Sequence, residues 1–259
     1  MLLENRVAIV SGIGPGLGQA TARALAREGA SVVLAARSAD KLEVLERELR
    51  AEGKEVLAVP TDIADAASCR ALADRTLTEF GCIDVLVNNA YHPGSYERIE
   101  DSDLDSWRPP FEVNVLGSLR LSQAVIPAMK QQRSGSIVMI NSMSMRRIME
   151  LFGGYAASKA ALNAATQTLA LEVGGHGIRV NSVVPGYIWG PPLEAYFDGE
   201  AKRAGIEPKA VYDGVAAQTA LKTIPTSEEI AESVVFFASD MSKVITGQSL
   251  DVNAGHWFW

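Results

Sequence analysis

The stretch VAIVSGIGPGLG, residues 7–18, decides the predicted fold. It joins a short apolar run to a turn that holds Gly12, Gly16 and Gly18, and a helical pattern follows directly. Glycines at these positions permit a tight turn and let backbone N–H groups approach an anion at the N-terminus of the helix. The place of this turn in the first βα unit predicts a site for the pyrophosphate of a dinucleotide, and the alternative is a merely flexible turn.

The rest of the chain repeats the same alternation of apolar runs and helical patterns. The runs are nearly unbroken, as expected for parallel strands covered on both faces. The expected strands are residues 7–10, 31–36, 55–59, 83–87, 136–140, 178–183 and 248–252. The expected helices are residues 17–28, a second helix capped by Ser38, 65–80, 103–130 with a break and restart at Pro109-Pro110, 151–173 and 227–239. Strict alternation of strand and helix predicts an α/β fold with a doubly wound parallel sheet.

Composition limits the classes of protein to which the chain can belong. The 24 Lys+Arg against 31 Asp+Glu give a net charge of −7, which disfavours nucleic acid and anionic membranes as partners. Charges interrupt the first residues, MLLENR, and every later apolar run, so we expect no signal peptide and no membrane span. Two cysteines favour a reducing, cytoplasmic location. The three histidines lack metal-ligand spacing, so no metal site is expected.

Residues 186–226 are the irregular part of the chain. Prolines interrupt this segment, and apolar helical fragments occur at about residues 193–204 and 209–220. A segment of this length inside a regular βα chain is usually functional. We therefore expect one dinucleotide-binding domain over residues 1–259, with a substrate lid at about residues 186–226.

The end of the second expected strand bears on the choice of cofactor. An acidic residue there normally binds the ribose 2′-OH of NAD. This chain has Ala35-Ala36-Arg37-Ser38 instead, and the guanidinium of Arg37 suits a 2′-phosphate. The alternative is that Arg37 is a solvated loop residue. We predict NADP(H) as the preferred cofactor, with NAD(H) as the alternative.

Tyr155 and Lys159 stand four residues apart in the fifth expected helix, so they lie on the same face of that helix. A free phenol titrates near 10 and is a poor base at neutral pH. A nearby ammonium stabilises the phenolate, so Lys159 is expected to lower the pKa of Tyr155. The alternative is an ordinary surface pair.

The order of these motifs resembles the short-chain dehydrogenase/reductase family, in its branch of roughly 250 residues with a YxxxK motif. The resemblance covers essentially the whole chain. The turn at residues 11–18 is similar to the family's TGxxxGxG with serine for threonine, and Asn88-Asn89-Ala90 resembles its NNAG. The other positions that match the family's pattern are Asp62, Asn114, Ser142, Tyr155, Lys159, Pro185 and Gly186.

The resemblance implies a Rossmann-type seven-stranded parallel sheet, order 3-2-1-4-5-6-7, with helices on both faces. It also implies hydride transfer between NADP(H) and an alcohol or ketone. Tyr155 would be the general acid/base beside Lys159, which also binds the ribose. Ser142 would hydrogen-bond the substrate oxygen, and Asn114 would hold a water that links Lys159 to solvent. The implied cofactor-binding residues are Gly12, Gly14, Gly16, Leu17, Gly18, Arg37, Asp62, Ile63, Asn89, Ala90, Tyr155, Lys159, Pro185, Gly186 and Ile188.

Three features depart from the family's pattern, and one of them is the intrusion of Pro109-Pro110 into the helix just before Asn114. Tyr91 replaces the glycine of NNAG and puts a large ring near the cofactor-binding strand end. Gly190 replaces a threonine that commonly holds the nicotinamide carboxamide, so backbone groups around Ile188 are expected to serve instead. None of the three departures removes a reacting group.

The aromatic and aliphatic side chains of the expected lid indicate an apolar substrate such as a steroid, a cyclic alcohol or a fatty alcohol. The candidate substrate-binding residues are Tyr91, His92, Met143, Trp189 and Leu193. A 3-oxoacyl-thioester reductase is the alternative within the family, and a non-catalytic dinucleotide sensor is the alternative outside it. If the protein were a sensor, we would expect at least one reacting group to be lost. This chain keeps all four residues of the implied catalytic set, Asn114, Ser142, Tyr155 and Lys159.

The chain ends in His256-Trp257-Phe258-Trp259, which is strongly aromatic. Exposed rings in such number would form an adhesive patch, so we expect them to be buried against a neighbouring subunit. A homotetramer or a homodimer, both common in the family, is therefore predicted.

Overall fold

The computed structural model describes residues 1–258, and within them seven strands form one parallel sheet in the order β3-β2-β1-β4-β5-β6-β7. The strands are β1 (Val7–Ser11), β2 (Ser31–Ala36), β3 (Val56–Pro60), β4 (Val85–Asn88), β5 (Gly135–Ile140), β6 (Ile178–Pro185) and β7 (Ser249–Val252). Each strand begins and ends within two residues of its predicted bounds. The predicted fold class and strand order are confirmed.

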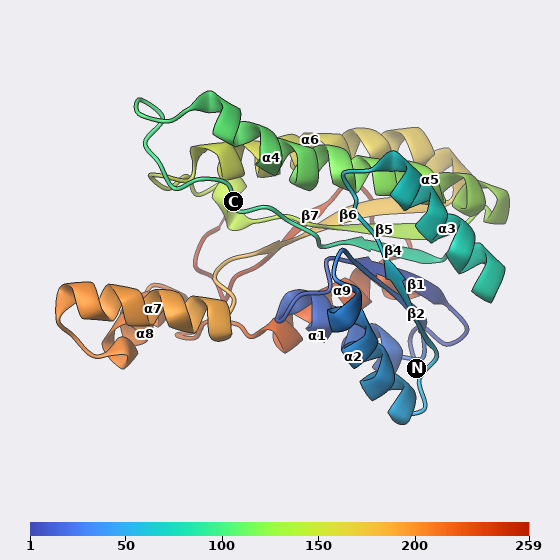
Figure 1. The fold of residues 1–259 in the computed structure, drawn as a ribbon, viewed down its shortest axis with the longest axis horizontal. Helices are drawn as coiled ribbons and strands as arrows, with labels where there is room; N and C mark the ends of the chain where they lie inside the picture. Colours follow the sequence, from blue (N-terminus) through green and yellow to red (C-terminus); the bar gives the residue numbers. More distant parts are fainter. Residues whose placement is uncertain (259) are drawn as a thin grey trace.

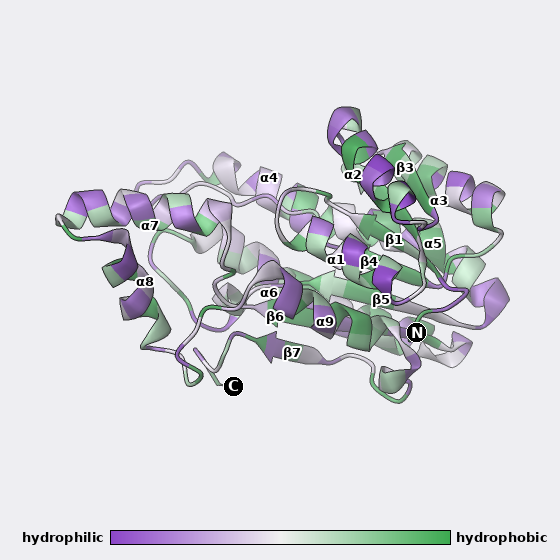
Figure 2. Ribbon diagram, turned by 90° about the horizontal axis from the view of Figure 1, so that it is seen from below, coloured by the Kyte–Doolittle hydropathy of each residue, from purple (hydrophilic) through white to green (hydrophobic). Residues whose placement is uncertain are grey.

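Helices cover both faces of the sheet (Figure 1). One face carries α1 (Leu17–Arg27), α2 (Ala39–Ala51) and α9 (Ser227–Ala238), and the other carries α3 (Ala66–Phe80), α5 (Ser118–Gln132) and α6 (Gly153–Val173). Leu25, Leu45 and Val234 belong to the core on the first face. Leu72 and Leu162 belong to the core on the second. Because both faces are covered, the central strands consist mostly of buried apolar residues, whereas the edge strand β7 includes hydrophilic residues and is partly purple in Figure 2.

The region that was predicted to break at two prolines is helical almost throughout. A 3-10 turn η1 (Leu104–Trp107) leads into α4 (Arg108–Phe111), then into a π-helical turn η2 (Glu112–Gly117) and α5. Pro109 and Pro110 lie in the first turn of α4, where a missing N–H leaves no hydrogen bond unmade. The restart at a proline is therefore confirmed, but the break is only a change of helix type. The π turn, which contains the buried Asn114, was not expected from the sequence.

The helix that follows β2 begins as predicted, but its cap differs. Ser38 occupies the N-cap position of α2, yet in the described part of the chain its side chain accepts no capping hydrogen bond. The expected capping role of Ser38 is thus wrong. Its hydroxyl is free for another partner, because Ser38 is exposed at the end of β2.

The segment between β6 and α9 forms two helices that project away from the sheet (Figure 1). These are α7 (Pro191–Ala204) and α8 (Pro208–Ala216), and α8 ends four residues before its predicted end. Phe197, Ala216 and Ile224 form a small core of their own between these helices. The remaining short helical turns are η3 (Met143–Met145), η4 (Gly174–His176) and η5 (Asp240–Ser242).

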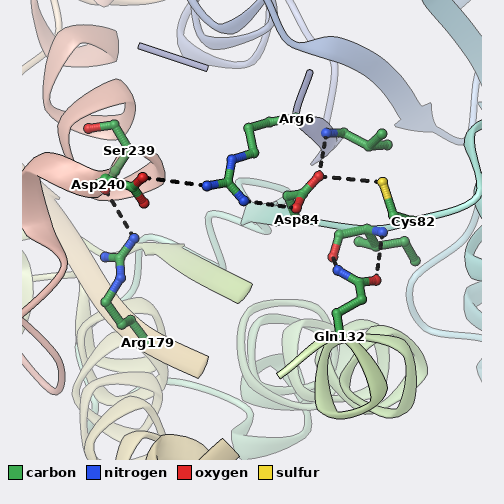
Figure 3. Close-up of polar contacts among 9 residues, drawn as sticks. Arg6, Cys82, Asp84, Gln132, Arg179, Ser239 and Asp240 are labelled. Atoms are coloured by element: carbon green, nitrogen blue, oxygen red, sulfur yellow. Dashed lines mark hydrogen bonds and ion pairs between the residues drawn. The ribbon is translucent and has the colours of Figure 1, made fainter. Parts of the chain in front are cut away.

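Charged and polar side chains join the amino ends of several strands (Figure 3). A carboxylate oxygen of Asp84, just before β4, accepts a hydrogen bond from the backbone nitrogen of Val7 at 2.8 Å. Arg6 pairs with Asp84 at 3.2 Å and with Asp240 at 3.5 Å. Gln132 donates to and accepts from the backbone of Ile83. These contacts hold the amino ends of the strands together, at the end of the sheet opposite the cavity described below.

Candidate active site

A cavity of about 960 Å³ opens at the carboxyl ends of the strands. Such a position is where ligands bind in open parallel sheets. The predicted site residues that line the cavity are Gly12, Gly14, Gly16, Leu17, Gly18, Arg37, Asp62, Ile63, Asn89, Ala90, Tyr91, His92, Ser142, Tyr155, Lys159, Pro185, Gly186, Ile188, Trp189 and Leu193. Asn114 and Met143 are not among its lining residues within the described chain.

The glycine turn brings bare backbone to one side of the cavity. Gly12 has φ +78°, and a Cβ on it would lie 2.5 Å from the Cα of Ala90. A Cβ on Gly18 would lie 2.2 Å from the carbonyl oxygen of Gly12, whereas one on Gly14 would meet open space. The Asn89 amide donates to the Gly12 carbonyl at 2.8 Å and holds the turn in place.

The turn fits a dinucleotide pyrophosphate. No side chain caps α1 in the described chain, so the N–H groups of its first turn stay available at the edge of the cavity. Gly14, with open space beside it, lets a ligand approach the backbone closely. Both features favour anion binding at the N-terminus of α1.

Arg37 and Ser38 line the cavity at the end of β2, together with Lys41 from the first turn of α2. Lys41 was missed at the sequence level. Its place in the site depends on where α2 begins, because Arg37 lies before that helix and Lys41 lies in its first turn. Two cations and a free hydroxyl therefore border this part of the cavity.

The chemistry of Tyr155 and Lys159 is set by burial. The Lys159 ammonium is buried, donates to the carbonyl of Ile140 at 2.7 Å, and lies 5.8 Å from the centre of the Tyr155 ring. Desolvation lowers the pKa of Lys159 to about 7. Desolvation also raises the pKa of Tyr155 to about 12, against the opposing hydrogen bond with Ser142.

The expected lowering of the Tyr155 pKa is thus wrong for the protein alone. The prediction counted the charge of the lysine but not the cost of taking both groups out of water. At neutral pH the structure holds a protonated phenol beside a lysine that is close to losing its proton.

Ser142 follows β5 and faces Tyr155. Its hydroxyl oxygen accepts from the backbone nitrogen of Ser144 at 3.2 Å and from the Ser144 hydroxyl at 3.0 Å. These contacts fix the oxygen of Ser142 on the cavity wall, where it hydrogen-bonds with Tyr155.

Asn114 is buried beside the cavity and, in the described chain, is not one of its lining residues. Its amide oxygen accepts from the backbone nitrogen of His92 at 2.7 Å, and its amide nitrogen donates to the His92 carbonyl at 3.0 Å and to Ser158 at 2.9 Å. The asparagine thereby ties the loop after β4 to the helix that carries Tyr155. The predicted water between Lys159 and solvent stays a prediction.

The candidate substrate residues separate into two groups. Tyr91, His92, Trp189 and Leu193 line the cavity, and Tyr91 is exposed. Met143 is buried, and its sulfur lies 3.3 Å from where a Cβ of Gly186 would be, so it supports the cavity floor. Thr61, Val113 and Asn141 also line the cavity and were not predicted from the sequence, whereas Tyr196, another lining residue, belongs to the aromatic side chains of the expected lid. The first three stand next to predicted motifs, and no pattern of their own marked them.

The C-terminal segment packs beside the start of the expected lid. The ring of His256 stacks on Tyr187 with centroids 5.7 Å apart. Trp257 and Phe258 are exposed on the single chain, with 41% and 77% of their surface accessible. Trp259, the last part of the predicted aromatic patch, lies outside the described residues.

Within residues 1–258 no group of His, Cys, Asp or Glu side chains is placed to hold a metal ion. No helix in that range has the length and apolar character to cross a membrane.

Comparison with known proteins agrees with the geometry. The family model described as enoyl-(acyl carrier protein) reductase matches residues 12–256. The chain is 35% identical over 257 residues to the 3-oxoacyl-[acyl-carrier-protein] reductase of Escherichia coli, covering 98% of each chain. It is 35% identical over 254 residues to a cis-4-hydroxycyclohexanecarboxylate dehydrogenase of Sinomonas cyclohexanicum, covering 97% of this chain and 96% of that one.

The crystal structure of an NAD⁺-bound xylitol dehydrogenase superposes with a TM-score of 0.91 at 30% identity, over 98% of this chain and 100% of that one. The fold, the cavity and these matches together define an oxidoreductase. The chain belongs to the short-chain dehydrogenase/reductase family, whose members use NAD(P)(H) and bind small-molecule substrates.

Proposed function

We propose that the protein is an NADP(H)-dependent alcohol dehydrogenase or carbonyl reductase that acts on an apolar alcohol or ketone. The observation that carries this proposal is the meeting of the glycine turn, Ser142, Tyr155 and Lys159 in one cavity. When bound there, the nicotinamide accepts or donates the hydride.

The residues of the chain supply binding and proton chemistry. Tyr155 exchanges a proton with the substrate oxygen, and its raised pKa keeps the phenol protonated and ready to donate in the reductive direction. The Ser142 hydroxyl hydrogen-bonds the same oxygen as charge develops on it. Lys159, with a pKa of about 7, exchanges protons near neutral pH and binds the ribose hydroxyls. The catalytic set that we propose is Asn114, Ser142, Tyr155 and Lys159.

The proposed preference for NADP(H) rests on Arg37 and Lys41. Both side chains border the cavity at the end of β2, where the ribose of a dinucleotide lies in this fold. No carboxylate occupies residues 35–38 to bind a free 2′-OH. A 2′-phosphate would accept charge-assisted hydrogen bonds from both cations.

The proposed substrate is apolar, because Trp189, Leu193 and Tyr196 form the wall of the cavity on the side of α7. The relative that acts on a hydroxycyclohexanecarboxylate favours a cyclic alcohol. The 3-oxoacyl reductase among the relatives favours the alternative, a 3-oxoacyl-thioester substrate. A non-catalytic dinucleotide sensor is disfavoured because the four reacting residues are present.

Several finer features belong to the same proposal. Residues 1–259 form one domain in which about residues 186–226 act as the substrate lid. The aromatic C-terminus contacts a neighbouring subunit in a homotetramer or homodimer. The protein is cytoplasmic, and neither nucleic acid nor a membrane is its partner.

Calorimetric titration with NADPH and NADH tests the cofactor proposal. We expect tighter binding of NADPH, and we expect Arg37→Ala to weaken NADPH binding by about 10- to 100-fold while NADH binding stays unchanged. Lys41→Ala should have a smaller effect in the same direction. The matched control is Arg47→Ala. Arg47 also lies on α2, but among the described residues it is not one that lines the cavity. Tighter binding of NADH by the wild type would overturn the preference.

Turnover with a substrate panel tests the reaction class. The panel contains cyclic ketones, long-chain ketones and a 3-oxoacyl thioester, each with the better cofactor. The proposal predicts the highest kcat/KM for an apolar ketone. A higher kcat/KM for the thioester would establish the alternative, and binding of the cofactor without turnover of any carbonyl would favour the sensor.

A further inference from the structure

Trp107 lies outside the cavity lining but against the helix turn that carries Tyr155. A Cβ on Gly153 would lie 2.9 Å from Cζ2 of Trp107, and a Cβ on Gly154 would lie 3.1 Å from its Cγ. The indole ring therefore packs directly on the backbone of two successive glycines at the start of α6. Neither glycine has a positive φ, so backbone conformation does not require glycine at these two positions. The close approach of the indole ring does, because it leaves no room for a side chain.

Tyr155 is the next residue along α6, and its surroundings are fixed from a second side. A Cβ on Gly94 would lie 3.6 Å from the backbone nitrogen of Tyr155. The ring of Phe152 meets that of Tyr155 edge to face at 6.5 Å and that of Tyr96 at 5.0 Å. The first turn of α6, which carries the phenol, is therefore in contact with two neighbours. One is the segment at residues 94–96, and the other is the indole of Trp107.

The segment at residues 94–96 and the turn that contains Trp107 are also hydrogen-bonded to each other. Trp107 ends the 3-10 turn η1, where Asp103 accepts a hydrogen bond from the backbone nitrogen of Asp105 at 3.0 Å. The hydroxyls of Ser106 and Ser95 are hydrogen-bonded at 3.0 Å. The loop after β4 and η1 therefore form one connected support beneath the first turn of α6.

We propose that Trp107 is a positioning residue: by packing on Gly153 and Gly154, it sets the place of the Tyr155 phenol relative to Ser142. The inference rests on the proposed function of Tyr155 as general acid/base. Trp107 does not line the cavity in the described chain, so it acts only through α6. Small displacements of a proton donor lower the rate of reaction far more than they lower ligand affinity.

Steady-state kinetics of four variants test the proposal. Trp107→Ala should lower kcat by about 10- to 100-fold and leave the Kd of NADPH within about twofold of the wild type. Trp107→Phe, which keeps a flat ring on the glycines, should restore kcat to within about threefold of the wild type. Gly154→Ala, which pushes the indole away, should reproduce much of the loss. Gly174→Ala, beyond the other end of α6 where a Cβ meets nothing, is the matched control and should have wild-type kcat.

A second readout separates positioning from general destabilisation and from the proposed function itself. The six tyrosines are labelled with ¹³C at Cζ, and the Tyr155 signal is assigned with Tyr155→Phe. Trp107→Ala should shift or broaden that signal, while Gly174→Ala should leave it unchanged, even if no carbonyl substrate is ever found. An unchanged Tyr155 signal and an unchanged kcat in Trp107→Ala would overturn the proposal. So would equal losses of kcat, NADPH affinity and melting temperature that Trp107→Phe does not rescue.

Discussion

Among the single residues of the site, Lys159 shows most directly how burial changes the pKa of a proposed catalytic group. Its ammonium is buried with a backbone carbonyl as partner, and its pKa falls from 10.5 to about 7. In the unfolded chain the lysine keeps its proton up to about pH 10.4. Between these two pKa values the unfolded state binds more protons than the folded state, so the free energy of unfolding rises with pH.

This linkage gives a prediction for Lys159→Met. From pH 6 to pH 9 the free energy of unfolding of the wild type should rise by about 2–3 kcal/mol more than that of the variant. Chemical denaturation at both pH values measures the difference, with the exposed Lys243→Met as the control. Equal pH dependence in wild type and Lys159→Met would show that the lysine is not desolvated in the folded protein.

Sequence patterns predicted the identity of the site residues better than their electrostatics. Tyr155, Lys159 and Ser142 were found from spacing and family resemblance, and the structure places them in one cavity. The direction of the Tyr155 pKa depends on how much water surrounds the phenol, and no spacing of residues reports that. Lys41 was missed because its place in the site depends on where α2 begins.

Among the elements of the site, the glycine turn between β1 and α1 is closely packed against its neighbours. A Cβ on Gly18 would meet the Gly12 carbonyl oxygen at 2.2 Å, which is backbone and cannot rotate away. Gly18→Ala should lower the free energy of unfolding by about 1–3 kcal/mol and weaken dinucleotide binding.

Gly14→Ala provides the matched comparison for this prediction. Its added Cβ meets open space, so stability should change by at most about 0.5 kcal/mol. Denaturant titration of both variants without ligand measures the contrast. Equal stability of Gly18→Ala and Gly14→Ala would contradict the close packing of the turn.

The regular elements were predictable because the apolar runs are long and both faces of the sheet are covered. The π turn at residues 112–117 was not, since two prolines upstream predicted a break and nothing in the sequence marks a wider helical turn. The capping role of Ser38 failed for a similar reason, because cap geometry depends on the angle at which the chain enters the helix.

In the whole molecule, the amino ends and the carboxyl ends of the strands differ in their residues and in their proposed roles. The amino ends are joined by Arg6, Asp84, Asp240 and their neighbours, which hold the strands together (Figure 3). The carboxyl ends border the cavity and carry the residues proposed for binding and proton transfer. The helices α7 and α8 project on the side of the cavity, where Trp189 and Leu193 contribute to its wall (Figure 1).

In the proposed reaction, Tyr155 transfers the proton that accompanies hydride transfer. The most direct measurement is the single-turnover rate of Tyr155→Phe with saturating cofactor, on the best substrate of the wild type. We predict a loss of about 100- to 10,000-fold in that rate, with the Kd of NADPH within about twofold of the wild-type value. Full turnover by Tyr155→Phe with the cofactor still bound would contradict the account.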